Sequence, residues 1–182
     1  MIGVINQADC LVLVVSSAQG EFESSVAGKG HMRDQLLIAH AFGVKRVIVV
    51  VNKLDLLPPN LTELRFKEVI FEVKSILMAI GFDLHSVIFL PLSGLTADNL
   101  HKKSDKLVWF NGPSLVQAID LLPVPQRPFD LPLRMPIHAC FKISGVGTVA
   151  LGRIETGKMK PGMKVAFCPG VLVSECRTIE MH

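Results

Sequence analysis

The chain has 182 residues, of which 49% are apolar and 19% are charged, proportions typical of a globular protein rather than a disordered one. Its longest apolar runs, Cys10–Val15 and Val47–Val51, fall far short of the roughly 20 residues that span a bilayer, so we expect no membrane association. The formal net charge of +3 is too small to indicate nucleic-acid binding by itself. Only 4 cysteines and no recognisable secretory leader favour a reducing, cytoplasmic location.

Short β-branched runs alternate with amphipathic stretches in the first part of the chain. Gly43 and Gly81 follow two of these stretches, at the position where glycine commonly ends a helix. The predicted elements, in chain order, are a strand at Cys10–Ser17, a helix at Met32–Phe42, a strand at Val44–Val51, a helix at Leu61–Ile80, a strand at Ser86–Leu92 and a helix at Ser114–Leu121. This alternation predicts an α/β fold in which helices flank a parallel sheet, with right-handed crossovers.

The pattern then changes at a cluster of prolines, which cannot continue a helix or a central strand. These are Pro123, Pro125, Pro128, Pro132 and Pro136. Short β-like runs separated by glycines follow, at Ile137–Ile143, Thr148–Ile154 and Lys164–Phe167. We therefore expect an α/β unit at residues 1–125, a linker at 126–131 and an all-β unit at 132–182, which is short for a closed barrel.

The strongest candidate site is Asn52-Lys53-Leu54-Asp55, directly after the second predicted strand. Ligands of open parallel sheets bind outside the carboxyl ends of the strands. An aspartate there can accept hydrogen bonds from N1 and the exocyclic N2 of guanine, and the asparagine can reach the acceptor edge of the base. The aliphatic stem of Lys53 can cover one ring face. The alternative is a solvated turn with a helix-capping aspartate.

A second element, Ser93-Gly94-Leu95, follows the third predicted strand. It lies at the same edge of the sheet, where the Ser93 hydroxyl and nearby backbone N–H groups can face the same base. Glycine at position 94 allows the backbone to approach closely. Two base-reading elements after neighbouring buried strands together favour a guanine-nucleotide site over an ordinary turn.

The phosphate half of such a site has no match in these residues. A triphosphate site needs G-x-x-x-x-G-K-[ST], whose backbone cradles the phosphates and whose hydroxyl reaches the metal. Gly152–Lys158 comes close, but Met159 replaces the hydroxyl residue and Pro161-Gly162 follows instead of a helix. We therefore assign no residue to catalysis or to a magnesium ion.

Two other groups of residues have less specific patterns. His138 and Cys140 share a strand face, but no C-x₂-C pair accompanies them, so we expect no zinc site. Lysines 102, 103 and 106 precede Trp109-Phe110, a combination that suits RNA stacking but is more commonly an aromatic packed under a loop.

Several segments occur together, in this order, in one known family. They are Gln7–Cys10, Gly20–Glu23, Gly43–Lys45, Val51–Asp55, Pro91–Gly94, Asp98–Leu100, Trp109-Phe110, Arg127-Pro128, Pro132–Pro136, Lys142–Val149, Gly152–Gly157 and Lys160–Met163. Through them the chain resembles, over essentially its whole length, the elongation factor 1-alpha family of translational GTPases. The later β motifs distinguish this family from the small GTPases.

The resemblance implies a GTP-binding domain that ends near Pro125, followed by the start of a β-barrel. It places the base contacts on Asn52, Lys53, Asp55, Ser93, Gly94 and Leu95. At position 95 elongation factor 1-alpha usually carries tryptophan, and leucine is closer to the release-factor and ribosome-rescue relatives. Intact members bind GTP or GDP with Mg²⁺ in the cytoplasm and deliver aminoacyl-tRNA to the ribosome, with a nucleotide exchange factor as a further partner.

The chain also departs from the family pattern. The family's phosphate loop, switch regions and Asp-x-x-Gly segment lie upstream of the position that matches Met1, and its β domains continue beyond the position of His182. Where the family has Gly-Gln-Thr-Arg-Glu-His, residues 30–35 read Gly-His-Met-Arg-Asp-Gln, which bears on exchange-factor binding. We therefore expect a GTPase fragment that is inactive alone. The alternatives are a truncated non-catalytic paralogue or scaffold, or a release-factor or ribosome-rescue relative.

Overall fold

The computed structural model describes residues 8–27, 31–170 and 172–181. The chain forms two compact units, Met1–Val124 and Pro125–His182. Of the residues used in the sequence comparison, Gln7, Gly30 and His182 lie outside the described residues.

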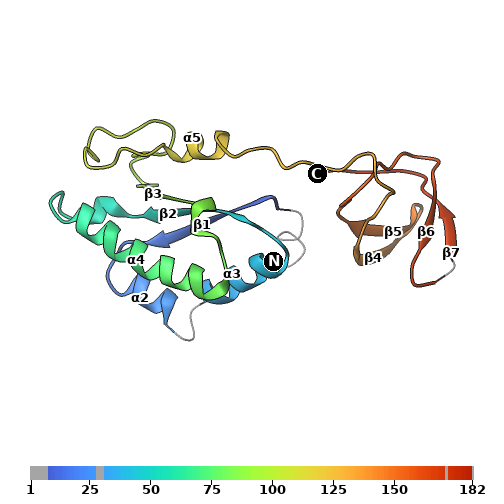
Figure 1. Ribbon diagram of the computed structural model, residues 1–182, viewed down its shortest axis with the longest axis horizontal. Helices are drawn as coiled ribbons and strands as arrows, with labels where there is room; N and C mark the ends of the chain where they lie inside the picture. The colour runs from blue at the N-terminus through green and yellow to red at the C-terminus, as the bar shows by residue number, and fades with distance from the viewer. Residues whose placement is uncertain (1–7, 28–30, 171, 182) are drawn as a thin grey trace. The chain divides into compact units, whose positions relative to one another are not determined.

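The first unit contains a three-stranded parallel sheet, which confirms the predicted α/β class (Figure 1). Its strands are β1 (Cys10–Ser16), β2 (Arg46–Asn52) and β3 (Val87–Pro91), with β2 in the centre. Each observed boundary lies within two residues of the prediction. The register pairs Val51 of β2 with Pro91 of β3, so both strands end at one edge of the sheet.

The helices of this unit are α2 (Glu21–Val26), α3 (His31–Ala41), α4 (Thr62–Ile80) and α5 (Leu115–Asp120). Short 3-10 turns at Leu54–Leu56 and Leu84–Ser86 precede α4 and β3. Helix α4 ends at Gly81, whose φ of 107° is the left-handed conformation that suits glycine. Ser114 and Gln117 form a reciprocal capping box at the start of α5. Helix α2 was not predicted, because six residues are too few to show a helical period.

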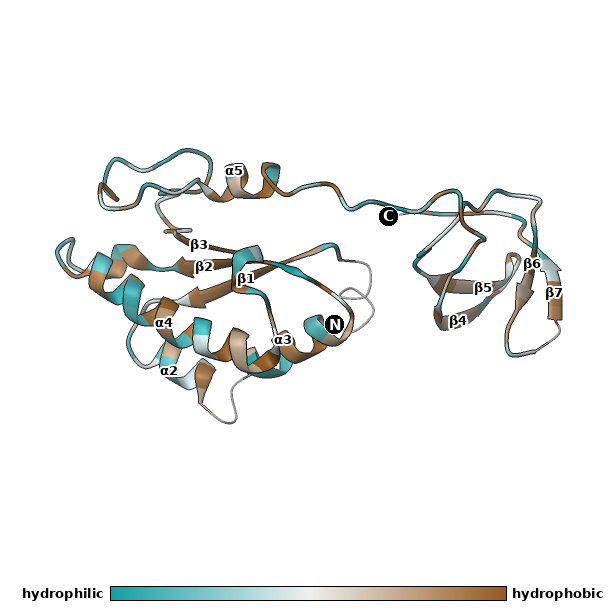
Figure 2. Cartoon of the chain, viewed as in Figure 1, coloured by the Kyte–Doolittle hydropathy of each residue, from teal (hydrophilic) through white to brown (hydrophobic). Residues whose placement is uncertain are grey.

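The two faces of the sheet pack against different helices (Figures 1 and 2). Alternate residues of β2 point to opposite faces. Val47, Val49 and Val51 belong to a core cluster with α3 and α4. Ile48 and Val50 belong to a second cluster that includes Ala118 of α5. This burial on both faces explains the continuous apolar run of β2.

Strand β1 forms one edge of this sheet and is less covered than β2. Val12 and Val14 pair in register with Ile48 and Val50, yet they are 40% and 58% exposed. Helix α5 packs over β2 and β3 on that face but does not cover these two valines. The described residues therefore leave an apolar strip along an edge strand.

The second unit consists of antiparallel hairpins. Strand β4 (Ile137–Ile143) pairs with β5 (Gly147–Gly152), and β6 (Lys164–Phe167) pairs with β7 (Leu172–Glu175). The all-β character confirms the prediction, although β7 was not predicted and β5 ends before Ile154. Gly157 has φ 76°, and an added Cβ would approach the Leu133 backbone to 2.7 Å. This glycine therefore serves a tight backbone contact rather than a phosphate loop.

Candidate guanine-recognition site

The candidate residues lie where β2 and β3 end. Asn52 is the last residue of β2, and the backbone N–H of Leu92 still donates to the Val51 carbonyl at 2.8 Å just beyond β3. The parallel pairing therefore delivers two loops to the same edge of the sheet. One loop carries Lys53 and Asp55, and the other carries Ser93, Gly94 and Leu95.

A hydrogen bond joins these loops at Asn52. The backbone N–H of Gly94 donates to Asn52 Oδ1 at 2.9 Å. A Cβ built at Gly94 would lie 3.5 Å from the same oxygen, an ordinary van der Waals distance, so this hydrogen bond does not by itself require glycine at position 94. Since Oδ1 accepts this bond, the amide nitrogen Nδ2 is the group that can donate to a ligand.

A second hydrogen bond joins the loops at Asp55. The hydroxyl of Ser93 donates to Asp55 Oδ1 at 2.5 Å, and the backbone N–H of Thr96 donates to the same hydroxyl at 3.2 Å. Ser93 is buried at 2% exposure, whereas Asp55 is exposed in the Leu54–Leu56 turn. The buried serine thus fixes the position of the carboxylate, which remains accessible to solvent.

Lys53 adopts a left-handed backbone conformation, with φ 66° and ψ 28°. Its ammonium lies 2.6 Å from Glu21 Oε2 of α2. The hydrogen bond from Lys53, followed by one from Ser16, lowers the pKa of Glu21 below its ordinary value. Glu21 is a site neighbour that sequence reasoning missed, because a contact between α2 and the loop after β2 leaves no periodic signal.

Leu95 is 86% exposed. The structure places it beside Gly94 on the rim of the candidate site, without bringing it into the hydrogen bonds that join the two loops. Four of the six predicted residues form the hydrogen bonds that join the two loops, whereas Lys53 pairs with Glu21 of α2. Leu95 presents an apolar side chain to solvent next to them.

Asp98 organises the loop that carries Ser93 and Gly94. Its carboxylate accepts hydrogen bonds from Thr96 Oγ1 at 2.6 Å, Ser104 Oγ at 2.8 Å and Lys106 Nζ at 2.9 Å. Chiefly because of the Thr96 and Lys106 hydrogen bonds, the pKa of Asp98 falls from 3.8 to about 2. The Ser93 N–H also donates to the Asp98 carbonyl at 3.1 Å. Sequence reasoning gave Asp98 no role, although it lies in a segment shared with the family.

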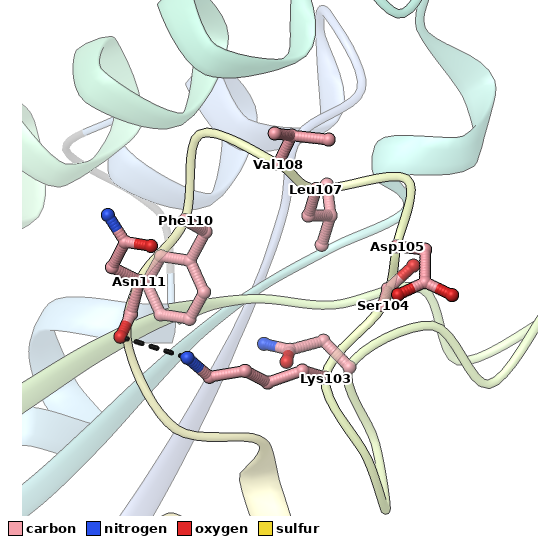
Figure 3. Close-up of a pocket in the computed structure, with 8 residues that line it drawn as sticks. Lys103, Ser104, Asp105, Leu107, Val108, Phe110 and Asn111 are labelled. Carbon is pink, nitrogen blue, oxygen red and sulfur yellow. Dashed lines mark hydrogen bonds between the residues drawn. The ribbon is translucent and has the colours of Figure 1, made fainter.

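The basic stretch that suggested RNA binding is largely engaged within its own loop. Lys103 Nζ donates to the Asn111 carbonyl at 3.2 Å beside a pocket of about 250 Å³ (Figure 3). Lys106 pairs with Asp98. The Trp109 ring packs against Phe66 at 5.1 Å between centroids, and its Nε1–H donates to Thr62 Oγ1 at 3.3 Å. These contacts favour packing over base stacking.

The arrangement suits a guanine base. It offers an exposed carboxylate, an amide donor, a lysine stem and a glycine backbone at the edge where parallel sheets bind ligands. The 182 residues contain no G-x-x-x-x-G-K-[ST] segment, the motif that cradles the phosphates of a triphosphate. Among the described residues, no cluster of three or more His, Cys, Asp or Glu side chains could hold a metal ion. None of the helices in that part of the chain is long and apolar enough to cross a membrane.

The comparisons with known proteins identify the family of this chain. Residues 1–124 match the family model of the elongation factor Tu GTP-binding domain. The chain therefore belongs to the translational GTPases that share this domain. Within them it is similar to elongation factor 1-alpha: the protein from Tetrahymena pyriformis is 42% identical to it over 182 residues, all of this chain and 42% of that protein.

Solved structures show the same relationship. Sup35 complexed with GMPPNP is 30% identical, with a TM-score of 0.60, and the match covers 93% of this chain and 42% of Sup35. Sup35 complexed with GDP is 31% identical, with a TM-score of 0.61, covering 96% and 43%. Elongation factor SelB from Methanococcus maripaludis, at 24% identity and a TM-score of 0.61, shares the fold. The chain spans about two fifths of the length of elongation factor 1-alpha and of Sup35, and 31% of SelB.

Proposed function

We propose that the first unit recognises the guanine base of GTP or GDP, as the base-binding part of an elongation factor 1-alpha-like GTPase. The observation that carries this proposal is the pair of hydrogen bonds between the two loops, Gly94 N–H to Asn52 and Ser93 Oγ to Asp55. They fix an acceptor and a donor at one edge of the sheet. Two loops joined in this way are pre-organised for a planar ligand.

Each residue has a distinct part in this proposal. Asp55 accepts hydrogen bonds from N1–H and the exocyclic amine of guanine, and Asn52 Nδ2 donates to the acceptor edge. The stem of Lys53 covers one ring face, with its ammonium directed to Glu21. Ser93 and Gly94 position the carboxylate and the amide, and Leu95 forms an apolar rim.

At the level of the whole protein, we propose a cytoplasmic factor that binds GTP with Mg²⁺ and delivers aminoacyl-tRNA to the ribosome, served by a nucleotide exchange factor. The 42% identity to elongation factor 1-alpha supports this role. Leu95, in place of the usual tryptophan of that factor, instead favours a release-factor or ribosome-rescue role as the second candidate. Mg²⁺ and the protein groups that contact the phosphates would stabilise the charge that develops during hydrolysis, and no residue of this chain is assigned to either role.

An NMR titration of the 182-residue chain with GMP and AMP tests base recognition, because NMR detects the weak binding expected from base contacts alone. We expect GMP to shift the amide signals of Gly94 and Asp55, and AMP to leave them unchanged. Asp55→Asn should move the preference from GMP to xanthosine monophosphate, since the Asn amide can donate to the O2 of xanthine.

The matched control is Asp105→Asn, an exposed aspartate in the loop after β3, which should leave the response to GMP unchanged. Equal responses to GMP and AMP in the unsubstituted chain would show that the two loops do not recognise guanine. An Asp55→Asn chain that still prefers GMP would remove Asp55 from the proposed contacts.

A further inference from the structure

A groove of about 520 Å³ lies between α2 and α4, outside the candidate base site. Figure 1 shows the two helices on the same side of the sheet. The apolar part of its lining is formed mainly by Phe22 and Val26 of α2 and Phe71 of α4. Phe22 is buried at 4% exposure, whereas Phe71 is 71% exposed. A large aromatic side chain is therefore displayed at the mouth of a groove that has an apolar floor.

Helix α4 continues this apolar surface along its length. Leu64, Phe71 and Met78 recur every seven residues and are 57%, 71% and 57% exposed. Residues seven apart lie on the same face of a helix, so these three side chains form an exposed apolar row, with charged residues such as Lys67, Glu68 and Lys74 between them. The core side of α4 uses other residues, including Val69, Val73 and Leu77. The row is therefore an addition to the face that packs on the sheet.

The walls of the groove are acidic. Glu23, Glu68 and Glu72 line it, against a single arginine, Arg65. The guanidinium of Arg65 is hydrogen-bonded inside the unit. It donates to Glu23 at 2.7 Å, to Glu68 at 3.3 Å and to the Ser17 carbonyl at 2.9 Å. Its side chain is only 13% exposed, whereas the side chains of Glu23 and Glu68 are 53% and 66% exposed. A ligand in the groove therefore meets negative charge around an apolar centre.

We propose that this groove binds a basic amphipathic helix of a partner protein. An apolar side chain of that helix would insert between Phe22 and Phe71, and its lysine or arginine side chains would pair with Glu68 and Glu72. The acidic lining favours a basic partner, and an apolar groove between two helices, continued by an exposed apolar row along α4, suits an amphipathic helix laid into it. This inference is independent of guanine binding, because none of the proposed base contacts lines the groove.

A pair of synthetic helical peptides of about 20 residues tests the proposal with the full 182-residue chain. Both carry leucine at the two apolar heptad positions; one has lysine and arginine at the flanking positions, and the other has glutamate there. We expect fluorescence anisotropy to show at least about tenfold tighter binding of the basic peptide, and weaker binding as salt is added.

Two variants locate the binding. Phe71→Ala removes the apolar anchor, and the double variant Glu68→Lys/Glu72→Lys reverses the charge of the lining. Each should weaken binding of the basic peptide by about tenfold or more. Phe141→Ala, which truncates an exposed phenylalanine of β4 in the other unit, should have no effect. Circular dichroism of each variant checks that the fold is retained, as the exposure of Phe71 leads us to expect.

Equal binding of the two peptides, or full binding by Phe71→Ala, would overturn the proposal. Self-association of the unsubstituted chain that Phe71→Ala abolishes, seen by sedimentation, would also overturn it, because a second copy of the chain would then be the occupant.

Discussion

Replacing Asp98 with asparagine tests how the loop after β3 is held in place. The pKa of Asp98 lies at about 2 instead of 3.8, so its carboxylate stabilises the fold by at most about 2.4 kcal/mol at 1.36 kcal/mol per pKa unit. The side chain of its partner Lys106 is 72% exposed and that of Asp98 is 21% exposed. Because solvent screens the pair, we expect Asp98→Asn to lower the free energy of unfolding by about 1–2 kcal/mol at pH 7.

The effect has a defined pH dependence. Because the folded-state pKa is lowered, the stabilisation is complete well above pH 3.8, the ordinary pKa of an aspartate, and is lost as the pH falls through about 2. The difference between the unsubstituted chain and Asp98→Asn should therefore be largest near neutrality and should shrink steadily below about pH 4.

Urea unfolding followed by tryptophan fluorescence measures this difference. Trp109 is the only tryptophan and packs on Phe66 of α4, so its emission reports on the first unit alone. Asp105→Asn, which changes an exposed residue of the same loop, should leave the free energy of unfolding nearly unchanged at any pH. Equal stability of Asp98→Asn and the unsubstituted chain at pH 7, or a difference that does not change with pH, would refute this account of the loop.

Three further outcomes are expected. Ser93→Ala should lower stability by about 1–2 kcal/mol and weaken the response to GMP, because the Asp55 carboxylate loses its buried donor; urea unfolding and the NMR titration measure both, and an unchanged response to GMP would contradict the positioning role. Val14→Lys should raise the fraction of chain that stays in the supernatant after centrifugation, since a charge on a half-exposed edge-strand valine opposes edge pairing; an unchanged fraction would argue against association through β1. The 182-residue chain should release no phosphate from GTP with Mg²⁺, because it contains no phosphate-loop motif; magnesium-dependent release by the purified chain would contradict this.

The parts of the fold that burial dictates could be predicted from the sequence. Strand β2 is buried on both faces, so its run of hydrophobic residues identified it and placed Asn52 and Asp55 at its end. Strands β4 and β6 have the predicted bounds, because glycine and proline turns flank them. The α/β class followed from the alternation of such runs with amphipathic stretches, and the family followed from the resemblance of segments along the whole chain.

Other parts depend on tertiary contacts that leave no local pattern. Helix α2 has six residues and is held by Glu23, which accepts from the Gly20 N–H at 2.6 Å and pairs with Arg65. Strand β7 is four residues long and exists through its pairing with β6. The role of Asp98 depends on Thr96, Ser104 and Lys106 lying around one carboxylate. None of these could be derived from periodicity.

Helix α2 connects the candidate base site with the acidic groove. Glu21 pairs with Lys53 at the base site, and Glu23 pairs with Arg65 in the groove. Arg65 also donates to the Ser17 carbonyl, and the Ser17 N–H donates to the Asn52 carbonyl at 2.8 Å. A ligand that draws Glu23 away from Arg65 would act on a residue that contacts the base site through Ser17. Any resulting coupling is reciprocal, so GMP must then change peptide affinity by the factor by which the peptide changes GMP affinity.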